Sequence, residues 1–311
     1  MRLSPSVTIV SAGLDWEHKD LRSIYQLKKT TPFRYVVVLY DLIPLLLPHF
    51  VVPAYVDLLT AYFGELFWTA DACIAISKTT EQDGQAYIAL NQLQTPPRLS
   101  NFVLGSDLPV VVGGDSAEES LPPQLNGVQF ALYVSTVEPR KNHRTLYHAW
   151  QVAIRNGWID PKTQKLVFVG HSGWNVGDLL YELDANPALE GSIIRLQGVS
   201  DELLDRLYRD AAFCLMPSRY EGYGLPLAES LRYGKPCLST SAGALCEVGG
   251  SLVTYLDPDD VFAWAESVSQ WFKSPGLLSD MSTKIRASYN PTGWSASAEE
   301  FYRQVLEEPR K

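Results

Sequence analysis

The chain has 311 residues, of which 46% are hydrophobic and 20% are charged, and this composition excludes an intrinsically disordered protein. The formal net charge of -9 argues against non-specific nucleic-acid binding, because such binding needs a basic surface. No nucleic-acid partner is therefore expected, although a local basic pocket for an anionic ligand remains compatible with this total.

The first third of the chain contains short apolar runs that predict buried strands, each followed by a segment able to form a helix. These runs occupy residues 7–10, 34–41 and 72–77. Residues 36–59 are also apolar, but Asp41, Asp57 and three prolines interrupt them, which argues against a membrane-spanning helix. The first ten residues lack the pattern of a signal peptide, so a cytoplasmic location is expected.

A linker is predicted over residues 108–129, which are rich in Gly, Pro, Ser and acidic residues. It divides the chain into an N-terminal domain over residues 1–107 and a C-terminal domain over residues 130–290. The last segment, residues 291–311, predicts a final amphipathic helix that is capped near Ser295 or Ser297.

The second half alternates strands and helices at a spacing typical of βαβ units, which indicates a parallel sheet. Asn142 and Asp201 are expected to cap two of these helices, and Gly234 to end a third. The expected strands are residues 130–137, 165–170, 192–199, 213–218 and 235–241. In such sheets ligands bind in the loops that follow the strands.

Two carboxylates flank a glycine-rich turn in PSRYEGYGLPLAES, which follows one of these strands. Glu221 is expected in the loop, and Glu229 about one turn into the next helix, whose first turn suits Pro226. Gly222 and Gly224 permit a ligand to approach the backbone, where helix amides can bind an anion. Each carboxylate can accept two hydrogen bonds from the vicinal hydroxyls of a sugar. The alternative is that both are solvated surface charges.

A second candidate site is the loop STVEPRKNHRTL, which also follows a predicted strand. Arg140 and Lys141 are adjacent there, and two such cations can bind a diphosphate. Two exposed loop cations without a ligand are the alternative interpretation.

Five segments together resemble the nucleotide-sugar half of the retaining family 4 glycosyltransferases, which have the GT-B fold. The segments are EPRKN, GVSDELLDRLYRDA, PSRYEGYGLPLAE, CEVGG and LDPDDVFAWAESV, in the family's order over residues 133–268. The resemblance implies two Rossmann-like parallel-sheet domains facing a cleft. It also implies transfer of a sugar, with retention, from a nucleotide diphosphate sugar to a glycan or lipid-linked acceptor. UDP is ranked first as the nucleotide and GDP-mannose second, with no other cofactor.

The resemblance further implies roles for particular residues. Glu229 would bind the ribose hydroxyls, Glu221 would contact the transferred sugar, and Arg140 with Lys141 would neutralise the leaving diphosphate. The other donor-binding candidates lie at the glycine-rich turn and around the base: Gly222, Tyr223, Gly224, Leu225, Val199, Ser200 and Leu204.

The N-terminal half resembles the family less completely, and it is short or truncated by roughly 100 residues relative to two full Rossmann halves. In YDLIPLLLP, Tyr40 stands where the family usually has histidine, and Tyr40 and Asp41 are the acceptor-side candidates. A further hypothesis is that apolar surface between Leu42 and Val56 rests on a membrane. The alternatives are a nucleotide-sugar-binding protein that has lost catalysis, and a phosphorylase or epimerase of the same architecture.

A metal site is not expected. The sequence DPD at residues 257–259 matches the D-x-D with which other glycosyltransferases hold a divalent ion, but it precedes a helix. Helix capping therefore explains it better. The four cysteines show no C-x-x-C spacing and are expected to be buried free thiols in a reducing compartment.

Overall fold

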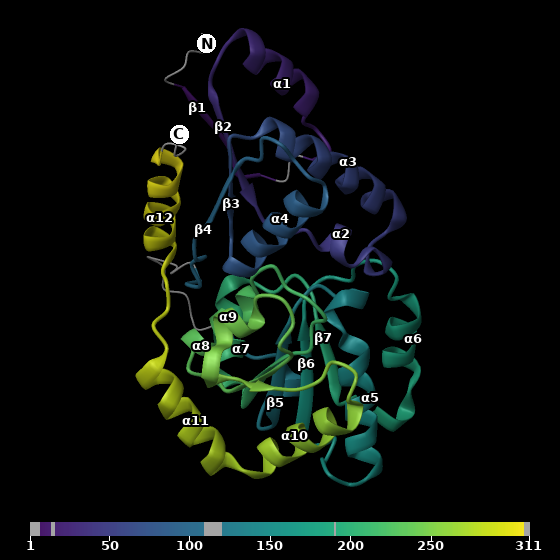
Figure 1. The fold of residues 1–311 in the computed structure, drawn as a ribbon. Helices are drawn as coiled ribbons and strands as arrows, with labels where there is room; N and C mark the ends of the chain where they lie inside the picture. The colour runs from purple at the N-terminus through teal and green to yellow at the C-terminus, as the bar shows by residue number, and fades with distance from the viewer. Residues whose placement is uncertain (1–6, 14–15, 109–119, 190, 308–311) are drawn as a thin grey trace. The chain divides into compact units, whose positions relative to one another are not determined.

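The computed structural model describes residues 7–13, 16–108, 120–189 and 191–307, which form two compact units (Figure 1). Unit 1 contains the described residues up to Gly105, the tripeptide Glu221–Tyr223, and the described residues from Thr292 onward. Unit 2 contains Ser106–Tyr220 and Gly224–Pro291, as far as they are described. Residues 109–119 of the predicted linker lie outside the described part of the chain.

Unit 1 is built on a parallel sheet with the strand order β1-β2-β3-β4. The three apolar runs of the sequence become strands, and the second and third of these are almost fully buried, because a sheet covered by helices excludes water from both faces. The first is only partly buried. The strands are β1 (Thr8–Ser11), β2 (Arg34–Leu39), β3 (Ala72–Ala75) and β4 (Arg98–Asn101). The intervening helices are α1 (Leu21–Thr30), α2 (Ile43–Leu46), α3 (Pro53–Thr69) and α4 (Lys78–Leu90).

The final helix, α12 (Trp294–Leu306), belongs to unit 1. Two arginines from the sheet hold its C-terminal end, where the last carbonyl groups of a helix lack partners within the helix. Arg34 donates hydrogen bonds to the carbonyl oxygens of Val305 and Glu307, each at 2.9 Å, and Arg98 donates to that of Gln304 at 2.5 Å. Cations at a helix C-terminus also favourably oppose the helix dipole.

Unit 2 contains a six-stranded parallel sheet with the order β10-β9-β8-β5-β6-β7. Its strands are β5 (Gln129–Val134), β6 (Gln164–Val169), β7 (Ile193–Leu196), β8 (Phe213–Met216), β9 (Cys237–Ser239) and β10 (Thr254–Tyr255). The chain first moves outward from β5 to β7 and then returns to place β8 on the other side of β5. This reversal is the doubly wound order of Rossmann folds, and it makes β5 and β8 the topological switch point.

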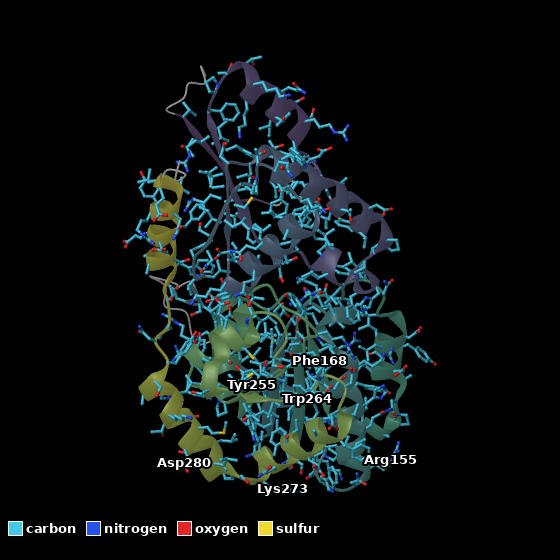
Figure 2. The ribbon with its side chains drawn as sticks, viewed as in Figure 1. Arg155, Phe168, Tyr255, Trp264, Lys273 and Asp280 are labelled. Atoms are coloured by element: carbon cyan, nitrogen blue, oxygen red, sulfur yellow. The ribbon has the colours of Figure 1, made fainter. Side chains whose placement is uncertain are left out.

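Helices α5 (His143–Arg155) and α10 (Val261–Lys273) pack against each other in unit 2. The buried residues of α5 include Leu146, Ala149, Trp150 and Ala153, the spacing of one helix face. Figure 2 shows the contrast between core residues such as Phe168 and Trp264 and the exposed Arg155, Lys273 and Asp280. The other helices are α6 (Gly177–Ala185), α7 (Asp201–Asp210), α8 (Leu225–Arg232), α9 (Leu245–Gly249) and α11 (Pro275–Ser288). The prediction of two parallel-sheet α/β domains is confirmed.

Several predicted caps are wrong. Helix α7 is capped by the hydroxyl of Ser200, which accepts a hydrogen bond from the amide of Leu203, so Asp201 is already the first helical residue. Gly293 occupies the cap position of α12, so neither of the two predicted serines caps that helix. Gly234 does follow the end of α8, with a φ of +68° that suits glycine.

The four cysteines are free thiols, as expected. Cys73, Cys214 and Cys237 are buried, whereas Cys246 is exposed, so the expectation of burial is correct for three of them. Burial raises the pKa of Cys73 and of Cys214 to about 12, which keeps these thiols protonated and unreactive at neutral pH.

Within the described residues, none of the helices combines the length and the apolar character required to cross a bilayer.

Candidate functional site

The loops after β5 and β8 meet at the switch point of unit 2. Arg140 and Lys141 lie in a short 3-10 turn, Pro139–Lys141, and the segment Pro217–Tyr220 follows β8. The amide of Arg219 donates a hydrogen bond to the carbonyl oxygen of Arg140 at 2.9 Å. The predicted cation pair therefore lies where ligands of doubly wound sheets bind, at the carboxyl ends of the strands.

Side chains fix the backbone of these two loops. The buried Tyr133 of β5 donates its hydroxyl to the carbonyl oxygen of Lys141 at 2.7 Å. Asn142 adopts the left-handed conformation, with a φ of 58°, which asparagine tolerates better than most residues. The side-chain nitrogen of Asn142, Nδ2, donates hydrogen bonds to the carbonyl oxygens of Pro217 and Pro258. Asn142 occupies the predicted N-cap position of α5, although its side chain bridges loops and makes no capping hydrogen bond.

Arg140 is held by two partners of unit 2. Its Nη2 lies 2.7 Å from Oε1 of Glu138, whose side chain is only 4% exposed. Its Nη1 donates to the carbonyl oxygen of Tyr220 at 2.6 Å. The guanidinium thus bridges the loop after β5 and the last residue of the segment after β8.

Helix α8 starts at the predicted position. Gly224 precedes its first residue, Leu225, and adopts a φ of +98°. A Cβ at Gly224 would lie 2.7 Å from Cδ2 of Leu245, so this position requires glycine for both its conformation and its close packing. The amides of the first turn of a helix lack partners within the helix and can bind an anion.

Glu229 is on α8 and is oriented by Tyr208 of α7. The buried Tyr208 hydroxyl donates to Oε2 of Glu229 at 2.7 Å, and the Tyr208 ring stacks on that of Tyr233 with 5.1 Å between centroids. Burial raises the pKa of Glu229; the Tyr208 hydrogen bond opposes that change, and the charge of Asp201 adds to it. A carboxylate held by one oxygen keeps acceptor capacity for a hydroxyl of a ligand.

The predicted base-side residues lie at the start of the same helix α7. Ser200 caps the helix, and Val199 and Leu204 are partly buried against the core of unit 2. Because α7 follows Val199 and Ser200 directly and carries both Leu204 and Tyr208, one helix links the predicted base-binding segment to Glu229.

The tripeptide Glu221–Tyr223 is grouped with unit 1, unlike the other donor-site candidates. The carbonyl oxygen of Gly222 accepts hydrogen bonds from Ser77 at 2.6 Å and from Thr80 at 3.1 Å, both at the start of α4. A Cβ on Gly222 would lie 2.6 Å from the carbonyl oxygen of Tyr40. The structure therefore brings the predicted acceptor-side segment against this tripeptide, in which Glu221 is only 5% exposed.

Two neighbouring candidates also have defined contacts in unit 1. Tyr223 donates its hydroxyl to the carbonyl oxygen of Leu104 at 3.2 Å. Asp41 accepts a hydrogen bond from the amide of Ile43 at 3.0 Å, at the entry to α2.

The DPD segment does not cap α10. Asp260 performs that function by accepting from the amide of Ala263 at 2.9 Å. Asp257 accepts from the amide of Asp259 at 2.8 Å, and Asp259 forms an ion pair with Arg219 of the loop after β8. Among the described residues, no group of three or more His, Cys, Asp or Glu side chains is arranged to hold a metal ion.

Four further residues that orient the site, Glu138, Tyr208, Ser77 and Thr80, were given no role from the sequence. Tyr208 is 21 residues from Glu229, and Ser77 is 145 residues from Gly222. The EPRKN motif gave a signal for Glu138, which is part of it, and the segment ISKTTEQD, which resembles a serine-containing turn of the family, contains Ser77 and Thr80.

Comparison with known sequences gives a family match. Residues 118–288 match the family model described as glycosyl transferases group 1. The serotype-specific mannosyltransferase WbdA of Escherichia coli is 29% identical over 270 residues, covering 84% of this chain and 32% of that protein. The O-antigen chain mannosyltransferase B of Escherichia coli is 37% identical over 150 residues, covering 47% of this chain and 38% of that protein. The chain thus spans about a third of the length of these relatives.

Solved structures share the fold. Sucrose-phosphate synthase from Thermosynechococcus elongatus has a TM-score of 0.68 at 20% identity, covering 96% of this chain and 73% of that one. HepE of Anabaena, in complex with UDP and glucose, has a TM-score of 0.68 at 15% identity, covering 95% and 77%. At these identities the likeness shows a common fold.

Proposed function

Because the chain belongs to the glycosyl transferases group 1 family, we propose that it transfers a hexose from a nucleotide diphosphate sugar to a glycan or lipid-linked acceptor. The observation that carries this proposal is the switch point of unit 2. There the Arg140–Lys141 loop is hydrogen-bonded to the loop after β8, and the next helix, α8, carries Glu229.

In the proposed donor site, hydrogen bonds hold the ribose, and a cation together with helix amides holds the diphosphate. The ribose hydroxyls bind to Glu229, the base lies near Val199, Ser200 and Leu204, and the diphosphate is bound by Lys141 and the first turn of α8. Breaking the anomeric C–O bond leaves negative charge on the diphosphate, and a fixed cation with aligned amides stabilises that charge. No metal is needed in this scheme.

The proposed stereochemical outcome is retention by attack of the acceptor on the face that the diphosphate leaves. The leaving phosphate takes the acceptor proton, the new glycosidic bond forms, and the bond to the diphosphate breaks. A double displacement would need a carboxylate nucleophile at the anomeric carbon, and Glu221 is assigned instead to a hydroxyl of the transferred sugar.

Mannose is the proposed sugar, because the two relatives named above are mannosyltransferases. GDP-mannose is therefore tested beside the UDP-sugar that the family resemblance ranked first. We expect turnover of one donor with a mannose-containing acceptor in EDTA, and an α-linked product by NMR from an α-linked donor. A β-linked product would contradict retention, and absence of transfer from every donor would favour the alternative, a nucleotide-sugar-binding protein that lacks catalysis.

Membrane contact by the segment from Leu42 to Val56 belongs to the same proposal. Between Asp41 and Asp57 this segment has no Asp, Glu, Lys or Arg, and Leu46 and Tyr55 are 43% and 42% exposed. We expect the protein to sediment with vesicles of phosphatidylethanolamine and phosphatidylglycerol, and the variant Leu46→Glu/Tyr55→Glu to bind at least fivefold less, by the cost of burying charge. Equal binding of the two proteins would refute this contact.

A further inference from the structure

The ion pair between Glu138 and Arg140 is mostly shielded from solvent. Their side chains are 4% and 14% exposed, and Oε1 of Glu138 lies 2.7 Å from Nη2 of Arg140. A buried carboxylate is stable only when it is paired and hydrogen-bonded, and removal of one partner leaves the other charge uncompensated. The pairing therefore fixes where the guanidinium points.

The same guanidinium connects two loops. Its Nη1 donates to the carbonyl oxygen of Tyr220 at 2.6 Å, while the carbonyl of Arg140 accepts from the amide of Arg219 at 2.9 Å. Side chain and backbone of one residue thus bind two consecutive residues of the segment after β8. Glu221, the carboxylate assigned to the transferred sugar, follows Tyr220 directly in the chain.

We propose that Arg140 is a positioning residue, oriented by Glu138, which sets the backbone position of Tyr220 and hence of the loop that leads to Glu221. The assignment deepens the proposed function and rests on it for its catalytic consequence. A planar fork of donors can reach the Glu138 carboxylate and the Tyr220 carbonyl together, whereas a lysine ammonium acts as a point charge at the end of a flexible chain.

This role predicts that Arg140 and Lys141 affect different quantities: Arg140 the rate of turnover, and Lys141 the preference for a nucleoside diphosphate over a monophosphate. A residue that binds the diphosphate determines how much more tightly the protein holds GDP than GMP. A residue that positions the loop affects turnover, since a displacement of about 1 Å in a reacting group can cost on the order of a hundredfold in rate.

The test compares Arg140→Lys, Glu138→Gln and Lys141→Met with the control Arg144→Lys, an exposed arginine of α5 that pairs with Glu182. Calorimetry gives the affinities for GDP, GMP, UDP and UMP, and kcat is measured at saturating donor. We expect Arg140→Lys and Glu138→Gln to lower kcat about 10- to 100-fold while the ratio of diphosphate to monophosphate affinity stays within about twofold. Lys141→Met should lower that ratio at least tenfold, and Arg144→Lys should change neither quantity.

Hydrogen exchange of the free protein tests the loop contact without any nucleotide. Arg140→Lys and Glu138→Gln should each increase exchange of the Arg219 amide more than tenfold, with native circular dichroism retained. Unchanged exchange in the conservative Arg140→Lys variant, or a fall in its diphosphate preference equal to that of Lys141→Met, would overturn the assignment. If the unaltered protein binds no nucleotide, the proposed function fails, and the exchange result still decides whether Arg140 holds the loop.

Discussion

Replacing Glu229 with glutamine should weaken nucleotide binding about 10- to 100-fold and raise the unfolding temperature of the free protein. Binding weakens because the ribose hydroxyls lose a charged acceptor, and hydrogen bonds to charged groups contribute roughly 1.5–3 kcal/mol against about 1 for neutral ones. Stability rises because burial raises the pKa of Glu229, so the folded protein favours the uncharged group. Glutamine is uncharged and can still accept the hydrogen bond from Tyr208.

In the unaltered protein, the stability that Glu229 contributes and the affinity for nucleotide depend on pH in opposite directions. The stability that comes from protonating Glu229 is present below pH 4.5, its ordinary pKa, and is lost as pH rises through the higher folded value. The variant should therefore unfold about 1–4 °C higher at pH 7, and this gain should disappear below pH 4.5. Nucleotide affinity of the unaltered protein should fall as pH decreases through the same folded value.

Thermal unfolding and calorimetry on Glu229→Gln, with Glu266→Gln as control, measure both effects. Glu266 is exposed on α10, so its variant should match the unaltered protein. A Glu229→Gln protein that keeps full nucleotide affinity would remove this residue from the donor site.

The second large effect concerns His143, the first residue of α5. Its imidazole is 1% exposed between the rings of Tyr133 and Phe168, and both ring nitrogens lack a hydrogen-bond partner among the described residues. Burial, with a smaller contribution from Lys141, lowers its pKa to about 3 from 6.5. The unfolded chain therefore binds a proton between these values that the folded protein does not bind, and stability is lost as pH falls from 6.5 toward 3.

The loss due to this histidine is on the order of 2 kcal/mol at pH 5, from these two pKa values. His143→Phe should remove it, so the variant should gain about 2 kcal/mol relative to the unaltered protein between pH 7.5 and pH 5. Urea unfolding at the two pH values measures the difference, with the exposed His18→Asn as control. Identical pH dependence in His143→Phe and the unaltered protein would show that the imidazole protonates in the folded state.

The sequence allowed prediction of elements whose pattern is local. Runs such as RYVVVL become β2, and the spacing of Leu146, Trp150 and Ala153 becomes the buried face of α5. The loops that follow β5 and β8 could be predicted as sites once these strands were recognised, because parallel strands present their carboxyl ends at one edge of the sheet and ligands bind there. The polar strand β4, Arg98–Asn101, has no apolar run, and its place in the sheet depends on pairing with β3.

Contacts between distant segments could not be predicted from these patterns. Ser77 and Thr80 donate hydrogen bonds to the carbonyl oxygen of Gly222, which is 145 and 142 residues further along the chain. In the sequence, Tyr208 cannot be distinguished from the other residues of an amphipathic helix. Its role depends on the hydrogen bond from α7 to Glu229 of α8. Capping was mispredicted where two suitable residues are adjacent: Ser200 precedes Asp201, and Asp260 follows Asp259, and only the backbone conformation selects between them.

The most direct test of the donor site is thermal unfolding in the presence of GDP, UDP, ADP and TDP, each with and without EDTA. A nucleotide at about a hundred times its dissociation constant stabilises the folded protein by roughly 2.7 kcal/mol, which should raise the unfolding temperature by several degrees. We expect such a rise with one nucleotide, unchanged by EDTA and strongly reduced in Glu229→Gln. No rise with any of the four nucleotides would contradict the proposed donor site.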